Sequence, residues 1–172
     1  MKSLAITGNF PEANVEALAV VVFKGEKASS ADLSGLDKIT GGLIASVIAN
    51  DEFKGDVGET ALLRFHPSGK VKASRVLLIG VGDRSDYKTH GVASVAGGAV
   101  RFLQKRKIKS FALLPRSAGN AVDLAQFAMQ GCITSQFELD KYKSKDKTKH
   151  TVNSFVLCVE GAKVAELKSG LN

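Results

Sequence analysis

The side chains that carry most enzyme chemistry are few in this chain and lie far apart. The histidines, His66, His90 and His150, stand in three different local contexts, and none belongs to an HExxH sequence or neighbours a cysteine pair. Common zinc sites need such spacing, because ligands from one element must converge on one ion. We therefore predict that the histidines are surface or turn residues, and that the chain has no metal-binding residue.

The two cysteines, Cys132 and Cys158, lie 26 positions apart without a CxxC spacing. Such a pair is typical of reduced, packed thiols in a cytoplasmic protein, rather than of a disulfide or a metal clip. No G-x-S-x-G sequence occurs, and nothing in the sequence places an activating base beside Cys132. The sequence therefore predicts no catalytic residue, and we expect that this chain alone is not an enzyme.

Gly80-Val81-Gly82-Asp83 is the strongest candidate for ligand binding. It follows an apolar run, and a glycine turn in that place can hold a phosphate at the start of the next helix. The dinucleotide fingerprint needs a third glycine at position 85, where this chain has Ser85, and no Walker lysine is present. We interpret residues 80–82 as a structural turn and predict no cofactor-binding residue.

The elements that would position these residues alternate along the chain. Apolar runs predict strands at Leu18–Phe23, Thr60–His66, Arg75–Val81, Phe111–Leu114 and Ser154–Val159. Apolar residues spaced by three and four predict helices over 36–48, Tyr87–Lys107, Asp123–Thr134 and Ala162–Leu171. Such alternation is typical of an α/β three-layer sandwich, with a mixed, mostly parallel sheet flanked by helices. No linker or composition break divides it.

Two of the predicted helices contain glycine pairs, Gly41-Gly42 and Gly97-Gly98. A pair of glycines costs a helix about 2 kcal/mol relative to alanines, so we expect another element to pack closely against Gly41-Gly42. Ser34 is the predicted N-cap of the first helix, and Asp37 favours the same end electrostatically.

Charge is distributed unevenly along the chain, whose net charge is +7. Residues 1–86 carry ten basic and eleven acidic side chains, whereas residues 87–172 carry fourteen and six, mostly at 101–109 and 141–149. Such a half can bind nucleic acid, but aromatic side chains are few, and we favour a solvated helix end and a mobile lysine loop at 140–151. No run is long enough to span a membrane and no signal peptide is evident, so we expect a cytoplasmic protein without membrane contact.

Several segments, in order, resemble the N-terminal domain of the leucyl aminopeptidase family. They are LAVVVFKGE at 18–26, LDKITGGLIASVIANDEFKGDVGET at 36–60, RVLLIGVGD at 75–83, the glycine pair at 97–98, and QGCITSQFELDKYKSK at 130–145. Relatives similarly have F-x-G-k-x-G-e-t after a helix, and a late Y-x-F-d-x-Y-K-s motif that residues 136–144 match only approximately. The resemblance covers nearly the whole chain.

This resemblance implies one macro-domain-like domain over residues 1–172, with the catalytic C-terminal domain absent from this chain. In that family two divalent metals, zinc or manganese, and the catalytic side chains lie in the C-terminal domain, and its Asn-Thr-Asp-Ala-Glu-Gly-Arg signature is absent here. The implied function is a non-catalytic accessory domain of an enzyme that removes N-terminal residues from peptides, supporting assembly of a homo-oligomer.

Two alternatives stay open: a stand-alone macro-like module that binds an ADP-ribose-type ligand at residues 80–82, and a nucleic-acid-binding domain that uses residues 101–149. In the resembling family the last helix continues into the catalytic half. For this chain we therefore expect residues 162–171 to be frayed or packed against another copy.

Overall fold

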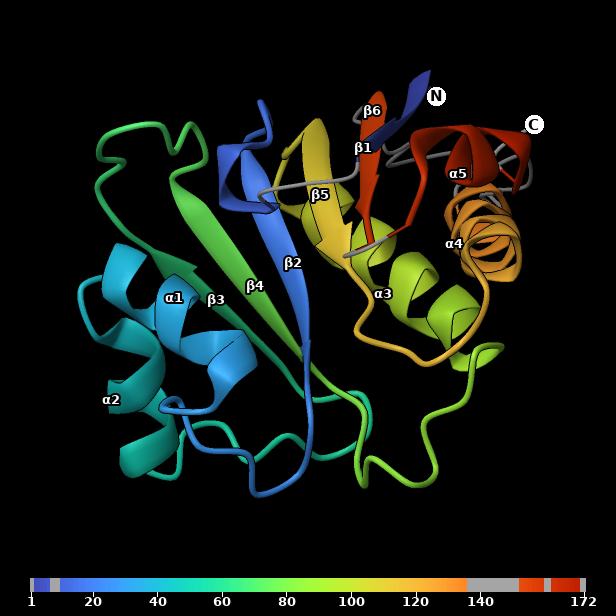
Figure 1. Ribbon diagram of the computed structural model, residues 1–172. Helices are drawn as coiled ribbons and strands as arrows, with labels where there is room; N and C mark the ends of the chain where they lie inside the picture. Colours follow the sequence, from blue (N-terminus) through green and yellow to red (C-terminus); the bar gives the residue numbers. More distant parts are fainter. Residues whose placement is uncertain (1, 7–9, 136–151, 160–161, 171–172) are drawn as a thin grey trace, which may run out of the picture.

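The computed structural model describes residues 2–6, 10–135, 152–159 and 162–170, which form a six-stranded sheet between helices (Figure 1). The strand order is β1-β6-β5-β2-β4-β3. The strands are β1 (Lys2–Ile6), β2 (Ala17–Val22), β3 (Thr60–Arg64), β4 (Arg75–Gly80), β5 (Ser110–Leu114) and β6 (Ser154–Cys158). All neighbours pair in parallel except β3, which runs antiparallel to β4 at one edge. The predicted mixed, mostly parallel sheet is confirmed.

Helices cover both faces of the sheet. On one face lie α1 (Ala31–Ile39) and α2 (Leu43–Ala49), and on the other α3 (Gly91–Lys105) and α4 (Ala121–Ser135) (Figure 1). A short 3-10 helix, η1 (Phe10–Glu12), precedes β2, and α5 (Val164–Gly170) packs beside α4. All six residues of β2 are buried, as expected of a strand covered on both faces.

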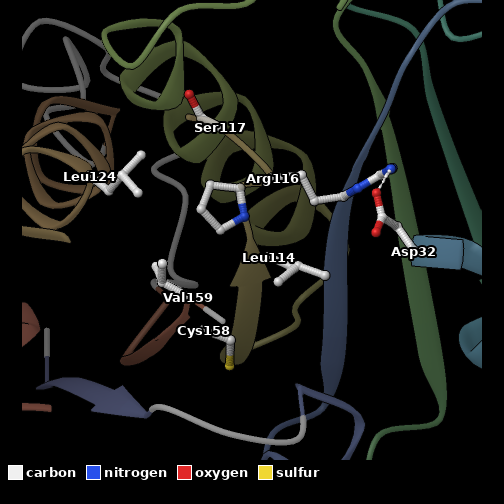
Figure 2. A pocket seen from close by; sticks show the side chains of 8 residues that line it. Asp32, Leu114, Arg116, Ser117, Leu124, Cys158 and Val159 are labelled. Atoms are coloured by element: carbon white, nitrogen blue, oxygen red, sulfur yellow. Dashed lines mark hydrogen bonds and ion pairs between the residues drawn. The ribbon is translucent and has the colours of Figure 1, made fainter. Parts of the chain in front are cut away.

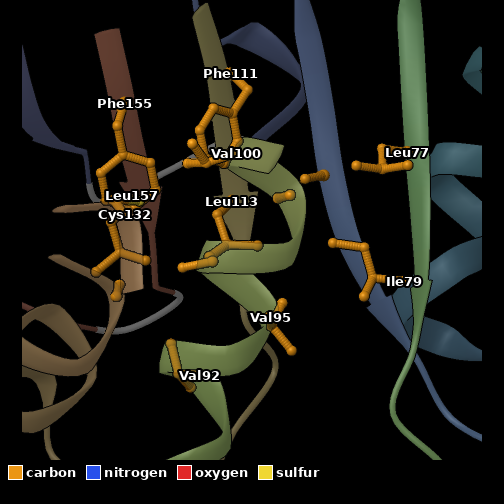
Figure 3. Packing of buried hydrophobic residues seen from close by; sticks show 14 of the residues in the cluster. Leu77, Ile79, Val92, Val95, Val100, Phe111, Leu113, Cys132, Phe155 and Leu157 are labelled. Atoms are coloured by element: carbon orange, nitrogen blue, oxygen red, sulfur yellow. The ribbon is translucent and has the colours of Figure 1, made fainter. Parts of the chain in front are cut away.

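Alternate residues of each strand contribute to two hydrophobic clusters. On β4, Leu77 and Ile79 face the cluster that contains α3 and α4, whereas Val76 and Leu78 belong to the cluster that contains α1 and α2. Figure 3 shows the first cluster, where side chains of β4, β5 and β6 meet those of α3 and α4. The period of two along the strands therefore places a core on both sides of the sheet.

Glycine allows α3 and α4 to approach closely. A Cβ at Gly131 would lie 2.0 Å from the carbonyl oxygen of Ala93, and a Cβ at Gly97 would lie 3.1 Å from the carbonyl oxygen of Gly131. Any side chain at 131 would force the helices apart, which explains the glycine in an otherwise regular helix.

Predictions about the first glycine pair are wrong. Gly41 and Gly42 have φ of 70° and 82° and no atom of another element near a would-be Cβ, so they end α1 and start α2 instead of receiving a packed neighbour.

Ser34 lies inside α1, whose N-cap is Ser30. Asp37 accepts the backbone N–H of Ala45 at 2.9 Å, and therefore stabilises the start of α2 rather than of α1.

The two ends of the described chain also differ from prediction. The sequence analysis assigned no strand to Lys2–Ile6, which pairs with β6 as an edge strand. The helix expected over 162–171 exists as α5, but it is packed within this chain: Leu167 is buried, and Gly170 approaches the backbone of Val122 on α4. Packing on α4 gives this helix a partner within the chain, whereas fraying of its end and contact with another copy stay predictions. Residues 136–151, which include the late motif, His150 and the whole lysine loop at 140–151, lie outside the described residues.

Candidate functional site

The carboxyl ends of β2 and β5 form the strongest candidate site. These strands are parallel neighbours, but the chain leaves β2 toward α1 on one face and β5 toward α4 on the other (Figure 1). Ligands of open α/β sheets bind where neighbouring strands send their connections to opposite faces, because the diverging loops leave a crevice there. In this chain charged side chains from the two loops span that crevice.

Arg116, which follows β5, reaches across the crevice to Glu26, which follows β2. Its two terminal nitrogens donate to the two carboxylate oxygens of Glu26, and Nη1 also donates to the carbonyl of Val21 at 2.7 Å. Only 5% of the Arg116 side chain and 8% of the Glu26 side chain are exposed. Glu26 also accepts the Phe23 N–H and the Ser30 hydroxyl, so each of its carboxylate oxygens has two donors, as a buried carboxylate requires.

Asp32, in the first turn of α1, is the second carboxylate that contacts Arg116. Nη2 of Arg116 donates to Oδ2 of Asp32 at 2.6 Å, and Nη2 of Arg84 lies 3.5 Å from the same oxygen. Both guanidinium groups also lie over the ring of Phe23, 4.2 Å (Arg84) and 5.0 Å (Arg116) from its centroid. We call the four charged residues Glu26, Asp32, Arg84 and Arg116 the Arg116 network.

The network sets the charge of its members. Burial alone would raise the pKa of Glu26, but hydrogen bonds from Arg116, the Phe23 N–H and Ser30 outweigh burial and hold it below its ordinary value. The hydrogen bond from Arg116 lowers the pKa of Asp32, with a smaller contribution from Arg84. Glu26 and Asp32 are therefore ionised at neutral pH, and these two anions lie against two guanidinium groups.

A cavity of about 190 Å³ lies beside the network, and we call it the Asp32 cavity. It is lined by Asp32, Leu114, Pro115, Arg116, Ser117, Leu124, Cys158 and Val159. Figure 2 shows Asp32 and Arg116 on one side of it, with Leu124, Cys158 and Val159 on the other. The buried Nε–H of Arg116 has no acceptor among the described residues. Burial raises the pKa of Cys158 to about 12, so its thiol stays neutral and is a poor nucleophile.

The glycine turn at residues 80–82 is packed against other backbone. The N–H groups of Gly80, Val81 and Gly82 donate to the carbonyls of Glu59, Val22 and Gly55, so none of the three is left to bind a phosphate. A Cβ at Gly80 would lie 2.2 Å from the carbonyl oxygen of Asp56. This geometry agrees with the interpretation of residues 80–82 as a structural turn.

A second group of backbone amides is filled by a carboxylate of the chain itself. One oxygen of Glu59 accepts the N–H groups of Lys54, Gly55 and Asp56, at 2.9, 2.8 and 3.1 Å. Three convergent N–H groups form an anion-binding concavity, and here Glu59 occupies it. We call residues 54–59 the Glu59 loop; they belong to the FKGDVGET segment on which the family resemblance rests.

A second depression, of about 300 Å³, lies beside the Glu59 loop, with Val22, Ile48 and Phe53 in its lining. Two lysines at its rim are already paired: Lys24 with Asp56 at 2.8 Å and Lys54 with Asp51 at 4.0 Å. Its cations are thus partly neutralised within the chain.

The remaining candidates from the sequence are scattered. His66 and His90 lie in different loops, and the described residues contain no group of three or more histidine, cysteine or acidic side chains that could hold a metal ion. Cys132, on α4, is fully buried, and burial raises its pKa to about 12.

The basic residues of 101–109 are exposed at the end of α3 and before β5, away from the crevice. No described helix is long and apolar enough to cross a membrane.

Sequence reasoning missed the Arg116 network. Its members are separated by up to 90 positions in the chain, so no local motif joins them. One signal was present: Glu26 and Arg116 each follow closely after a predicted buried strand, and the carboxyl ends of parallel strands meet at one edge of a sheet.

The strand order, the two helical layers and the crevice define an α/β domain of the macrodomain type. The macrodomain of Thermus aquaticus DarG has a TM-score of 0.63 to this chain at 13% identity, covering 92% of this chain and 98% of that one. A solved variant of tomato leucine aminopeptidase has a TM-score of 0.77 at 20% identity, covering 98% of this chain but 35% of that one. These likenesses show the fold.

Sequence comparison shows the family. The model of the cytosol aminopeptidase family, N-terminal domain, matches residues 19–146, so the chain belongs to this family and is its N-terminal domain. A relative from Alkaliphilus oremlandii, named a probable cytosol aminopeptidase, is 27% identical over 150 residues, which are 86% of this chain and 30% of the relative. The chain therefore spans about a third of the length of the relatives it matches.

Proposed function

We propose that this chain is the non-catalytic accessory domain of a cytoplasmic, metal-dependent aminopeptidase. The observation that carries the proposal is the family match over residues 19–146, together with a fold likeness to tomato leucine aminopeptidase over 98% of this chain. The aminopeptidase would remove N-terminal residues from peptides, and this domain would support assembly of its homo-oligomer.

Peptide hydrolysis would take place in a second, catalytic domain, against which this domain would pack. The family resemblance implies that two divalent metals, zinc or manganese, are held there, and such a pair would supply Lewis-acid activation of water for peptide hydrolysis. Most hydrogen-bonding groups of the Arg116 network donate to or accept from one another. We propose that residues 1–172 form one domain without a catalytic, cofactor-binding or metal-binding residue.

The fold is that of a macro-like module, but the backbone geometry at residues 80–82 does not favour an ADP-ribose-type ligand there. A phosphate at residues 80–82 would need free N–H groups, and all three donate to carbonyls. The nucleic-acid alternative uses residues 101–149, of which 136–149 lie outside the described residues. Among the described cations at 101–109 the one aromatic side chain is Phe102, and Arg106 already covers its ring at 3.6 Å.

The direct test is hydrolysis of leucine p-nitroanilide by the purified chain with manganese or zinc added. We expect no turnover above the buffer blank, while the full-length relative from Alkaliphilus oremlandii, assayed in parallel, serves as the active control. Metal-dependent turnover that a chelator abolishes would overturn the proposal.

The native gene product gives a second, independent readout. Because this chain covers 30% of its relative, we expect the native polypeptide to be about three times as long and to sediment as an oligomer. A native product of 18.2 kDa that sediments as a monomer would contradict the accessory role.

A further inference from the structure

Asp32 differs from the other carboxylate of the Arg116 network in its access to solvent. Its side chain is 47% exposed, whereas that of Glu26 is 8% exposed. Glu26 is fixed by four hydrogen bonds from three residues, but Asp32 is held only through guanidinium groups and sits in the first turn of α1, from which it can rotate into solvent. Of the two anions, Asp32 is the one that can be exchanged.

Removal of Asp32 would leave a site built for an oxyanion. Arg116 and Arg84 both point to its carboxylate, and only Glu26 would remain to balance them, so the site would carry a net positive charge. Both terminal nitrogens of Arg116 already donate to Glu26, so an incoming carboxylate would take the place of Asp32 on Nη2 of Arg116 and beside Nη2 of Arg84. The orphaned Nε–H of Arg116 is a further donor without an acceptor.

The Asp32 cavity beside this site would accept an apolar group. Leu114, Leu124 and Val159 are in its lining, together with the neutral thiol of Cys158. The volume of about 190 Å³ exceeds that of a branched four-carbon side chain.

We propose that the crevice between β2 and β5 is a binding site for small apolar carboxylates, which Asp32 closes by acting as an internal substitute for the ligand. The ligand's carboxylate replaces that of Asp32 on Arg116 and Arg84, and its apolar part enters the Asp32 cavity. No bond is made or broken, and the site does not depend on the accessory role proposed above.

The test uses isovalerate, a branched carboxylate, titrated by calorimetry into the wild-type chain and Asp32→Ala. We expect Asp32→Ala to bind isovalerate at least tenfold more tightly than the wild type, because the internal competitor is gone. Asp51→Ala removes an exposed carboxylate from a surface pair with Lys54 and serves as the matched control, which should bind like the wild type. Equal affinity in Asp32→Ala and the wild type would overturn the proposal.

Two related probes separate the parts of the site. Isovaleramide lacks the charge and acetate lacks the apolar group, so both should bind Asp32→Ala at least tenfold more weakly than isovalerate does. Val159→Phe in the Asp32→Ala background fills the cavity and should remove the preference for isovalerate over acetate. Binding of isovaleramide as tight as that of isovalerate would overturn the anion site.

Asp32→Asn keeps the shape of the side chain and makes the test independent of any folding defect in Asp32→Ala. We expect isovalerate to raise the Tm of Asp32→Asn more than that of the wild type, as mass action requires of a ligand that binds only the folded state. An equal rise in both would contradict the role of Asp32.

Discussion

The Arg116 network and the Glu59 loop hold carboxylates in two different ways. In the Glu59 loop a single carboxylate accepts three backbone N–H groups from residues three to five positions earlier. In the Arg116 network a buried guanidinium joins two loops whose residues lie 84 and 90 positions apart. The first arrangement stabilises one turn. The second joins the loop after β5 to the loop after β2, across the crevice of the sheet.

The two arrangements differ in how strongly the stability of the folded chain depends on one side chain. Backbone N–H groups of an exposed loop can turn to water when their carboxylate is lost, but a buried partner of a lost guanidinium cannot. We therefore expect single substitutions in the two regions to lower the free energy of unfolding by different amounts, in the order given below.

Arg116→Ala should have the largest effect. Glu26, with 8% of its side chain exposed, would keep its charge without its main partner, and uncompensated buried charges cost about 3–5 kcal/mol. Urea unfolding of the variant and the wild type measures the loss. A loss below about 1 kcal/mol would show that water replaces the guanidinium and that the crevice is not closed by this pair.

Glu59→Ala should cost less, about 1–3 kcal/mol, because it leaves three N–H groups without their acceptor but two of the three residues are exposed. Glu59→Gln, which keeps one acceptor oxygen, should recover part of that loss in the same urea experiment. If Glu59→Ala proved more damaging than Arg116→Ala, the order of the two regions would be reversed.

Acid should weaken the network gradually. In the folded chain the pKa values of Glu26 and Asp32 lie below their ordinary values of 4.5 and 3.8. The stability that the two ionised carboxylates contribute is therefore fully present above the ordinary values. It is lost as pH falls through the folded pKa values. We expect the difference in stability between the wild type and Glu26→Gln to shrink steadily below about pH 4. A constant difference down to pH 2 would contradict the coupling.

Arg84→Ala should have the smallest effect. The Arg84 side chain is 65% exposed, and exposed ion pairs contribute about 0–1 kcal/mol. This variant is the matched control for Arg116→Ala, since both guanidinium groups contact Asp32 and the ring of Phe23. A loss as large as that of Arg116→Ala would mean that charge balance, rather than burial, decides stability here.

The sequence predicted the layers of this fold because its buried strands are strongly apolar. Leu18–Phe23 and Arg75–Val81 are such runs, and the structure has β2 and β4 there. Lys2–Ile6 was missed because it is short and contains polar residues. Gly41-Gly42 was misread because a helical spacing continues across the break, and only the positive φ of both residues shows that the helix ends.

The candidate site was less predictable, for a physical reason. The Glu59 loop is local, and its sequence, KGDVGE, belongs to a segment that already supported the family resemblance. The Arg116 network exists only once β2 and β5 are neighbours, and the left-handed backbone of Arg116, with φ of 49°, directs its side chain across the crevice. No spacing in the sequence encodes that approach.

The backbone N–H groups of residues 80–82, where an ADP-ribose-type ligand would place its phosphates, all donate to carbonyls of the chain itself. Calorimetric titration of ADP-ribose into the wild-type chain tests this arrangement most directly, with Gly82→Val as the comparison. We expect no binding tighter than a Kd of ~10 μM, an affinity that corresponds to roughly 7 kcal/mol. Tighter binding by the wild type, lost in Gly82→Val, would show that residues 80–82 form a phosphate site.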